Sequence, residues 1–315
     1  MYNSIMKLII QIPCYNEEKT LPVTYKEIPE SIGGIDEIEI LVIDDGSTDN
    51  TVETAKNLGI KHIVSHSKNL GLARAFDTGL KTSIKLGADI IVNLDADNQY
   101  KASDIEKLIQ PVLNKEADIV IGARPIEKIR SFSPLKKLLQ KTGSYVMRKI
   151  SGADVLDAPS GFRAFSKNAA MKINIFDNYT YTMETIIQAQ YKGLTIKSVP
   201  IGVNENLRPS RLVKNNFDYI KRSIFTMLRF IIIYRPFRFF MKISLLLFFF
   251  GLFLGLRFLY FYITESGEGH IQSLILCAIL ILVGVQSLFF AVIADLLAIN
   301  RKLIEDVQLN IKNKE

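Results

Sequence analysis

The sequence predicts an α/β protein built around a doubly wound, parallel sheet. From residue 7 to about residue 122, short β-branched runs alternate with longer amphipathic segments. That alternation is typical of a parallel sheet with helices on both faces, because strands buried on both faces are nearly continuous apolar runs. With 315 residues, the chain is long enough for one large or two modest domains with a substantial core.

Each expected strand is a short apolar run, and the runs are residues 7–13, 38–44, 61–65, 88–94 and 117–122. The amphipathic segments between them are expected to be helical near 17–32, 49–58, 70–86 and 103–115. Beyond residue 122 the pattern is less regular, and it indicates a basic helix around 134–150, a helix near 180–192 and a strand around 195–203.

Three polar motifs follow these strands directly: IPCYNEE, IDDGSTDNT and LDADNQ. In parallel sheets, ligands bind beyond the carboxyl ends of the strands. Their common placement therefore predicts one binding site at that edge of the sheet.

The third motif brings oxygen ligands to alternate positions, Asp95, Asp97 and Gln99. In an extended chain, such positions point the same way. Two carboxylates this close repel each other, and burying them costs free energy unless a cation or a donor group compensates. Hard oxygen ligands suit Mg²⁺ or Mn²⁺ bound together with substrate phosphates, although an isolated D-x-D also occurs in turns where acids cap a helix.

The first two motifs offer groups for a nucleoside. Asp44 and Asp45 could accept hydrogen bonds from ribose hydroxyls or a base N–H. Tyr15 offers a stacking surface and Glu17 an acceptor, but the latter also fits the start of a helix. Gly46 allows the turn, and Ser47 or Asp49 could cap the next helix.

The C-terminal third indicates a membrane hairpin. Residues 243–263 and 271–294 are each long enough to cross a bilayer, and the acidic turn 264–270 joins them. Arg257, the one charge inside the spans, could snorkel to the interface or pair with a neighbour. Lys and Arg flank the hairpin on both sides, which predicts that both of its ends are cytoplasmic. Residues 213–238 carry an apolar stripe and a basic face, which favours an interfacial helix over a core helix.

Composition and charge indicate which partners and which cellular location to expect. The net charge of +7 fits an anionic membrane surface or anionic substrates. No nucleic-acid motif is found, so nucleic acid is not expected as a partner. Cys14 and Cys277 have no metal or redox spacing. The N-terminus lacks a signal-peptide pattern, and residues 1–212 are expected to stay in the cytoplasm.

The series IPCYNEE, LVIDDGSTDNT, NLGLARAFDTGL, DADNQY, GARP and DAPSGFRAF resembles glycosyltransferase family 2. With the hairpin, the likeness is to the dolichyl-phosphate mannose synthase type, whose bacterial members glycosylate undecaprenyl phosphate. The resemblance covers about residues 7–212 and implies a GT-A fold, a nucleotide-sugar donor and a divalent cation. It also implies a plasma-membrane or inner-membrane protein and hints at a homo-oligomer.

By position, the resemblance assigns the site residues. Pro13, Tyr15, Glu17 and Asp45 match the nucleoside contacts, and Asp95, Asp97 and Gln99 match the metal site. Arg124 matches an arginine that faces the donor or acceptor phosphates. Arg208 and Arg211 match a basic loop over the phosphates, in which Pro209 replaces the usual glycine and Arg211 the usual lysine. Where the family has a further arginine, this chain has Lys136 and Lys137.

Three residues keep two interpretations. Glu184 is expected as a helix-surface residue rather than as a base or orienting group. Ser160 and Arg163 could shape an acceptor pocket, but Gly161 and Phe162 could equally mark a packed turn.

The expected activity is metal-dependent, inverting transfer of a sugar from a UDP- or GDP-linked donor to a polyprenyl phosphate. Asp97, Arg124, Arg208 and Arg211 would serve catalysis. The expected organisation is a catalytic domain over 1–212, an amphipathic helix over 213–238 and a hairpin over 239–315.

Three other functions remain as alternatives: a glycan-elongating synthase of the same family, a nucleotidyltransferase and a non-catalytic, membrane-anchored binding subunit. The chain has no tryptophan and so lacks the QxxRW motif of processive synthases. IPCYNEE is acidic where a nucleotidyltransferase needs a basic, Gly-rich loop.

Overall fold

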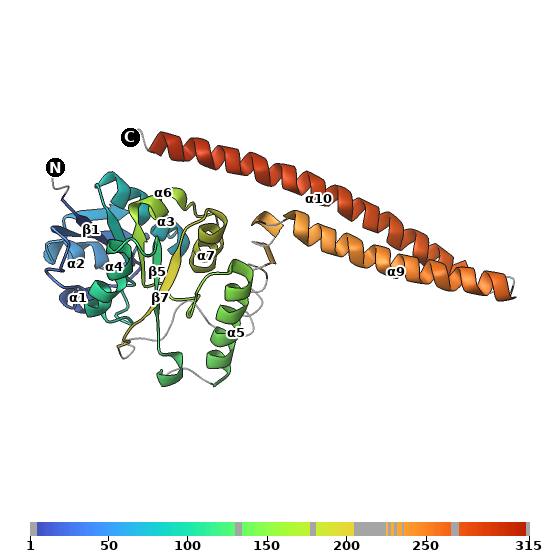
Figure 1. Ribbon diagram of the computed structural model, residues 1–315. Coiled ribbons are helices and arrows are strands. Elements are labelled where there is room, and N and C mark those ends of the chain that lie inside the picture. The colour runs from blue at the N-terminus through green and yellow to red at the C-terminus, as the bar shows by residue number, and fades with distance from the viewer. Residues whose placement is uncertain are drawn as a thin grey trace. The chain divides into compact units, whose positions relative to one another are not determined.

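The computed structural model describes residues 5–129, 134–176, 181–204, 236–265 and 271–312, together with residues 225, 228, 229 and 232–234. The chain divides into two compact units, Met1–Arg222 and Ser223–Glu315 (Figure 1). The interfacial helix expected at 213–238 lies largely outside the described residues.

The first unit is built on a seven-stranded sheet with the order β3-β2-β1-β4-β6-β5-β7. Its strands are β1 (Lys7–Cys14), β2 (Glu37–Asp44), β3 (His62–Ser65), β4 (Ile90–Asn93), β5 (Ile119–Ala123), β6 (Arg163–Ser166) and β7 (Ile196–Pro200). The predicted strands are therefore confirmed to within a few residues, and the five strands expected within residues 7–122 all run in the same direction. Strand β6, which the sequence did not indicate, runs antiparallel to both β4 and β5.

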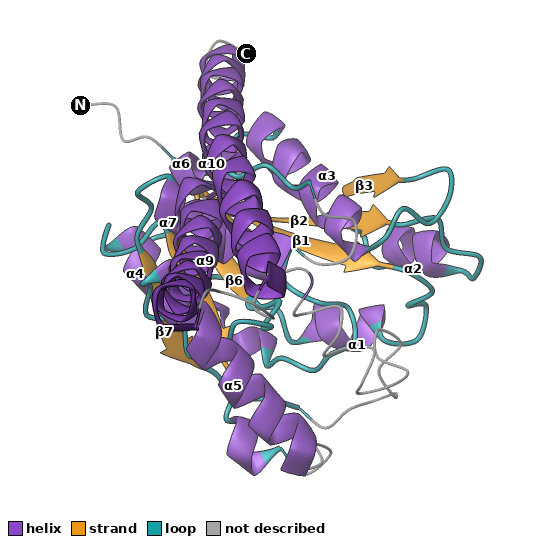
Figure 2. Cartoon of the chain, turned by 90° about the vertical axis from the view of Figure 1, so that its right-hand side faces the viewer, coloured by secondary structure: helices purple, strands orange, loops and turns teal. Residues whose placement is uncertain are grey.

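Helices cover both faces of this sheet (Figure 2). They are α1 (Leu21–Lys26), α2 (Thr51–Asn57), α3 (Leu72–Lys85), α4 (Ile105–Leu113), α5 (Pro134–Ser151), α6 (Lys167–Lys172) and α7 (Thr182–Tyr191). Helix α1 is shorter than the expected 17–32. Pro29 follows it, and a proline disfavours helical geometry in the residue before it.

In strand β1, successive side chains point to opposite faces of the sheet and so pack into both layers of the core. Leu8, Ile10 and Ile12 join the cluster that includes residues of α1 and α4. On the opposite face, Gln11 lies against α3, where a Cβ on Gly79 would be 2.5 Å from the Gln11 Oε1 atom. A side chain at position 79 would therefore clash with Gln11 unless the Gln11 side chain moved.

The second unit contains two long apolar helices, α9 (Pro236–Glu265) and α10 (Ile271–Lys312). Both are long and apolar enough to cross a membrane, with mean hydropathies of 2.2 and 2.7. Only small fractions of their apolar windows are buried, unlike the core helices of soluble domains. Helix α10 has 42 residues, about 63 Å at 1.5 Å per residue, so it extends well beyond the span expected at 271–294.

Small residues bring α9 and α10 together. A Cβ on Gly251 would be 3.0 Å from Ile281 Cγ1, and one on Gly255 would be 3.0 Å from Cys277 Sγ. Such small-xxx-small spacing lets helix backbones approach closely in membranes. Arg257 pairs with a neighbour, as expected, by donating to Ser273 Oγ at 3.1 Å.

Candidate active site

The polar motifs meet at one edge of the sheet because the strands that carry them are neighbours. In the β1–β2 register, Cys14 lies opposite Asp44, and the Asp45 N–H donates to Cys14 O at 2.8 Å. On the other side of β1, Gln11 pairs with Asn93 at the end of β4. The segments beginning at Tyr15, Asp45 and Leu94 therefore leave the sheet side by side.

The segment 95–99 is a turn, which differs from the extended geometry assumed for the metal ligands. Strand β4 ends at Asn93, Asn98 has a φ of 56°, and Asp97 Oδ1 accepts a hydrogen bond from the Gln99 N–H at 3.1 Å. Alternation along a strand therefore does not make the three side chains converge. The two carboxylates are nevertheless neighbours, since the charge of Asp97 perturbs the ionisation of Asp95.

Asp95 is the most perturbed acid in this region. Burial, followed by the charge of Asp97, raises its pKa to about 7, against a partial lowering by Arg124. The residue keeps some surface, yet its Oδ1 atom is buried without a hydrogen-bond partner. A buried acceptor without a partner beside a second carboxylate is the environment that a bound cation relieves.

The donor set fits a divalent cation of the Mg²⁺ or Mn²⁺ type. Among the described residues, no group of three or more His, Cys, Asp or Glu side chains could hold a metal, so Asp95 and Asp97 would act as a pair. Mg²⁺ is commonly bound by one or two carboxylates, with substrate phosphates and water completing the shell. The contacts described for Gln99 are made by its backbone. Its N–H donates to Asp97 Oδ1, and its C=O accepts from the Asn204 N–H.

Gly161 forms the wall against which Asp95 packs. A Cβ there would lie 2.7 Å from Asp95 Oδ2 and 2.9 Å from the Tyr181 hydroxyl oxygen. Gly161 is fixed from both sides, because its N–H donates to the Tyr100 hydroxyl at 3.0 Å and its C=O accepts from Asn93 Nδ2 at 3.0 Å. The SGF segment, which could have been an acceptor pocket or a packed turn, is a packed turn that supports the acidic pair.

Arg163, which follows that turn, has a structural role. Its side chain is fully buried, and its guanidinium donates to three backbone carbonyls and one hydroxyl: Ala158 O, Ser160 O, Thr182 O and Thr185 Oγ1. Burial lowers its pKa to about 10, so it stays charged at neutral pH. It joins the turn to the start of α7.

Arg124 is held by an acid that the sequence did not single out. Its guanidinium forms a two-pronged pair with Asp157, Nε to Oδ2 at 2.6 Å and Nη2 to Oδ1 at 3.0 Å. The side chains are 6% and 0% exposed, and Arg124 also lies over the Tyr100 ring at 5.9 Å. Asp157 belongs to the DAPSG motif, but nothing in the local pattern indicates its partner 33 residues away.

A cavity of about 480 Å³ opens beside this pair. Arg124, Lys141 and Arg148 contribute positive charge to its lining, and Glu127 contributes one negative charge. The N-terminal part of α5 adds a structural contact, since Lys137 Nζ donates to Glu127 O at 2.7 Å. Because Lys141 pairs with Glu127 and Arg124 pairs with Asp157, Arg148 supplies the excess of positive charge at this cavity.

Just after β2, Asp45 accepts two backbone hydrogen bonds and contacts a histidine that the sequence did not single out. Leu70 N–H donates to Oδ1 at 2.9 Å, Gly71 N–H donates to Oδ2 at 2.8 Å, and His66 Nδ1 lies 2.8 Å from Oδ1. Gly46 has a φ of 72°, as a turn glycine should.

The remaining residues of the IPCYNEE motif divide between core and surface. Pro13 is buried in β1, whereas Tyr15 is 39% exposed, as a stacking surface requires. Glu17 is 6% exposed, and its carboxylate accepts from the Thr20 hydroxyl. The N-cap residue of α2 is Asn50 rather than Ser47 or Asp49, although Asp49 Oδ1 accepts a hydrogen bond from the Thr51 N–H at 3.0 Å.

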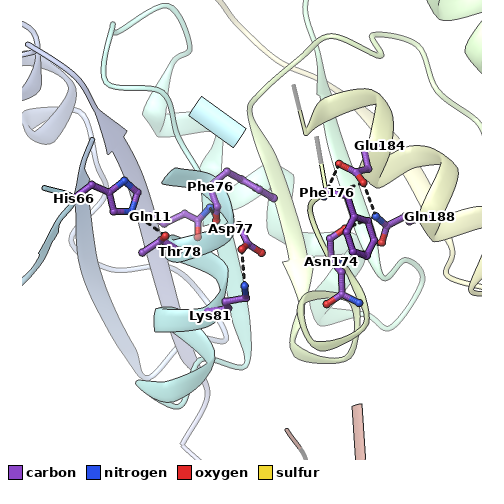
Figure 3. Close-up of polar contacts among 10 residues, drawn as sticks. All are labelled: Gln11, His66, Phe76, Asp77, Thr78, Lys81, Asn174, Phe176, Glu184 and Gln188. Carbon is purple, nitrogen blue, oxygen red and sulfur yellow. Dashed lines mark hydrogen bonds and ion pairs between the residues drawn. The ribbon is translucent and has the colours of Figure 1, made fainter. Parts of the chain in front are cut away.

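Glu184 corrects an expectation, because it is fully buried rather than on a helix surface. Both of its carboxylate oxygens accept from Phe176 N–H, at 3.1 and 3.2 Å, and Gln188 Nε2 donates to it at 3.2 Å (Figure 3). Glu184 therefore ties α7 to the segment after α6. Arg208 and Arg211 lie outside the described residues, as does the side chain of Lys136.

Residues 9–173 match the domain described as glycosyl transferase family 2. The chain belongs to that family. It is accordingly a glycosyltransferase, and the family 2 domain spans the sheet from β1 to β6.

Two curated relatives have similar sequences. A UDP-N-acetylglucosamine–dolichyl-phosphate N-acetylglucosaminyltransferase from Methanococcus voltae is 34% identical over 223 residues, which cover 64% of this chain and 86% of that protein. An undecaprenyl-phosphate mannosyltransferase from Micrococcus luteus is 27% identical over 206 residues, covering 62% and 83%.

A solved structure shares the fold of the family 2 domain. The crystal structure of glucosyl-3-phosphoglycerate synthase from Mycobacterium tuberculosis, with Mn²⁺, UDP-glucose and phosphoglyceric acid, aligns with a TM-score of 0.56 at 23% identity. The alignment covers 71% of this chain and 79% of that one.

Proposed function

We propose that this glycosyltransferase transfers a sugar from a nucleotide-sugar to a polyprenyl phosphate, giving a lipid-linked monosaccharide. The observation that carries the proposal is the Asp95 carboxylate, buried beside Asp97 with its Oδ1 atom lacking a partner. The two named relatives act on dolichyl or undecaprenyl phosphate, and the apolar helices α9 and α10 would keep this chain at a lipid surface.

In this proposal, Asp95 and Asp97 would hold Mg²⁺ or Mn²⁺, and Arg124 would attract the acceptor phosphate. When bound, the cation supplies positive charge that offsets the charge of the departing nucleoside diphosphate. Asp157 orients Arg124 at the basic cavity, where its charge would attract the acceptor phosphate. Arg208 and Arg211 remain proposed as further cations for the phosphates.

The acceptor chemistry needs little from a general base. A phosphate monoester oxygen is anionic at neutral pH, so it can attack the sugar carbon directly, with inversion, as the bond to the diphosphate breaks. Positioning and charge compensation then supply the rate enhancement. Glu184 agrees with this mechanism, because its oxygens are engaged by Phe176 and Gln188.

The proposed organisation is a cytoplasmic catalytic domain over 1–212, an amphipathic helix over 213–238 and a membrane hairpin over 239–315 with a cytoplasmic C-terminus. It motivates an assay with membranes rather than soluble acceptors. Membranes that contain the full chain are incubated with a panel of nucleotide-sugars and Mg²⁺ or Mn²⁺, and the lipid extract is analysed by mass spectrometry.

The expected product is a polyprenyl phosphate that has gained one sugar. Asp97→Ala should abolish its formation while the protein stays in the membrane. Glu53→Ala removes an exposed acid that pairs only with Lys56 among the described residues, so it is the matched control. Product formed by Asp97→Ala in the presence of a chelator would refute the metal assignment, and a wild-type chain that forms no sugar-lipid would refute the transfer itself.

A further inference from the structure

Helix α10 has one face buried within its own unit and an opposite face that is exposed. The buried face has a residue at every seventh position: Cys277, Gly284, Ala291 and Ala298. Helix α9 lies against this face (Figure 1), since Ser244 Oγ donates to Gly284 O at 2.8 Å and a Cβ on Gly255 would be 3.0 Å from Cys277 Sγ. Any further neighbour of α10 must therefore contact the opposite face.

The exposed face carries a seam in which steps of three and four residues alternate without a break from residue 272 to residue 311. Its apolar positions are between 39% and 64% exposed: Leu276, Ile279, Val283, Phe290, Ile293, Leu297, Ile304, Val307 and Ile311. Together with Gln272, Gln286 and Asn300, they form what we call the outer seam. This heptad spacing is the pattern of a helix that packs along its length against another helix.

The polar positions of the outer seam all carry amides. Gln272, Gln286 and Asn300 are exposed, and each lies two heptads from the next. Gln286 falls inside the apolar span 271–294, on the face that points away from α9. Hydrocarbon offers an amide no hydrogen-bond partner, so amides in membrane helices pair with side chains of neighbouring helices. The position of Gln286 therefore indicates a helix against the outer seam.

The partner that fits these amides is a second copy of the same chain. Copies of a membrane protein insert in the same orientation, so two α10 helices that meet along their outer seams are parallel and place each amide opposite its own counterpart. An amide carries two donors and an acceptor, so two amides satisfy each other across a two-fold axis. Lipid tails would cover the apolar positions but not Gln286, and a folded α/β unit with polar loops does not enter the hydrocarbon.

The outer seam also continues beyond the bilayer. Helix α10 has 42 residues, about 63 Å, whereas the hydrocarbon core of a bilayer is about 30 Å thick. Arg301 and Lys302 mark the polar boundary, and Ile304, Val307 and Ile311 follow it on the seam. Because one continuous helix cannot both cross the membrane and lie on its surface, lipid does not cover these three residues. A second α10 is long enough to cover them.

We propose that α10 packs along the outer seam on α10 of a second copy, in a parallel homo-oligomer whose register is set by Gln286 and Asn300. A polar residue at such a position fixes the register of coiled coils, because a shift would leave the amide facing apolar side chains. The arrangement keeps the catalytic units of both copies on one side of the membrane. The inference rests on the membrane hairpin of the proposed organisation and is independent of the transfer reaction.

The first test measures association of the full chain in a bilayer. The chain is labelled with one fluorophore and reconstituted into liposomes over a range of protein-to-lipid ratios, and photobleaching steps count the copies in each complex. In Gln286→Leu, the protein density at which half of the chains are associated should rise about 3- to 20-fold, from the value of one interhelical hydrogen bond in a membrane. Asn310→Leu is the matched control, because it replaces an exposed amide of α10 outside the outer seam.

The second test maps the face that makes the contact. Val307→Cys and Asp306→Cys place thiols at adjacent exposed positions, the first on the outer seam and the second off it. Oxidation with copper phenanthroline should link two copies of Val307→Cys, whereas Asp306→Cys should stay unlinked. The native thiols of Cys14 and Cys277 are both buried. Equal linking at positions 306 and 307 would refute the assigned face.

The outcomes separate this inference from the proposed function. Wild-type chains that stay single in liposomes at every density would overturn the association, and an unchanged density in Gln286→Leu would refute the role of the amide. A chain that alkaline carbonate removes from membranes would overturn the hairpin, and this inference with it. A chain that associates along the outer seam but forms no sugar-lipid would sustain this inference and refute only the transfer.

Discussion

Gly161 offers the sharpest test of how the acidic pair is supported. In Gly161→Ala, the new methyl group would lie 2.7 Å from Asp95 Oδ2 and 3.1 Å from Asp95 Oδ1. Ordinary contact begins near 3.4 Å, so the carboxylate would have to retreat by 3.4 − 2.7 = 0.7 Å. The glycine itself cannot yield easily, because Tyr100 and Asn93 hold its N–H and C=O.

The expected effect has two parts. Overpacking of this kind costs about 1–3 kcal/mol of stability. Displacing a group that orients a metal ligand costs about 10- to 100-fold in metal affinity. Mn²⁺ affinity of Gly161→Ala should therefore fall at least about tenfold, while the variant remains folded.

Manganese binding is measured directly by electron paramagnetic resonance of free Mn²⁺, alongside thermal unfolding, so that the readout does not depend on turnover. Gly33→Ala is the matched control, because a Cβ at Gly33 meets no atom within 4 Å. A folded Gly161→Ala that bound Mn²⁺ with wild-type affinity would show that Asp95 is not a ligand or that its position is not set by this turn.

Three further substitutions test the supporting structure. Asp157→Asn leaves the buried Arg124 without its anionic partner, so the free energy of unfolding should fall by about 3–5 kcal/mol in denaturant titrations; an unchanged midpoint would contradict this. Glu184→Ala should lower stability by about 1–3 kcal/mol because a buried N–H loses its acceptor, whereas the rate per folded molecule stays near wild type, and a selective loss of rate would instead indicate a catalytic carboxylate. Gly255→Leu should push α9 from α10 and increase the rate of maleimide labelling of Cys277 in detergent, at an overpacking cost of about 1–3 kcal/mol. A labelling rate equal to that of the wild type would refute the close packing of the hairpin.

The strands were predictable because each is a short apolar run that ends at a polar motif. β1, β2 and β5 all lie within a few residues of their expected ranges. β6 was not predictable in this way, since its residues, RAFS, begin with a charge and do not form an apolar run. Its antiparallel pairing with β4 and β5 depends on where the chain returns to the sheet after α5, which local pattern does not encode.

The candidate site was predictable as a list of residues but not as a set of contacts. Asp45 and Asp95 could be named because each follows a strand, and Arg124 because the GARP motif resembles one of the family. Their partners, His66 and Asp157, could not. His66 lies 21 residues from Asp45 in the sequence, and Asp157 lies 33 residues from Arg124. These contacts form only when the folded sheet brings the two loops of each pair together.

The three acids at this edge show why residue type alone does not assign a role. Asp45 and Asp157 are both nearly or fully buried, but donors from the protein compensate their charges. Asp95 instead has a buried oxygen, Oδ1, that has no hydrogen-bond partner among the described residues. A protein can retain such a carboxylate only if its proton or a ligand supplies the missing interaction. The difference in compensation, rather than the D-x-D pattern, is therefore what makes Asp95 the centre of the proposed cation site and leaves Asp157 a support for Arg124.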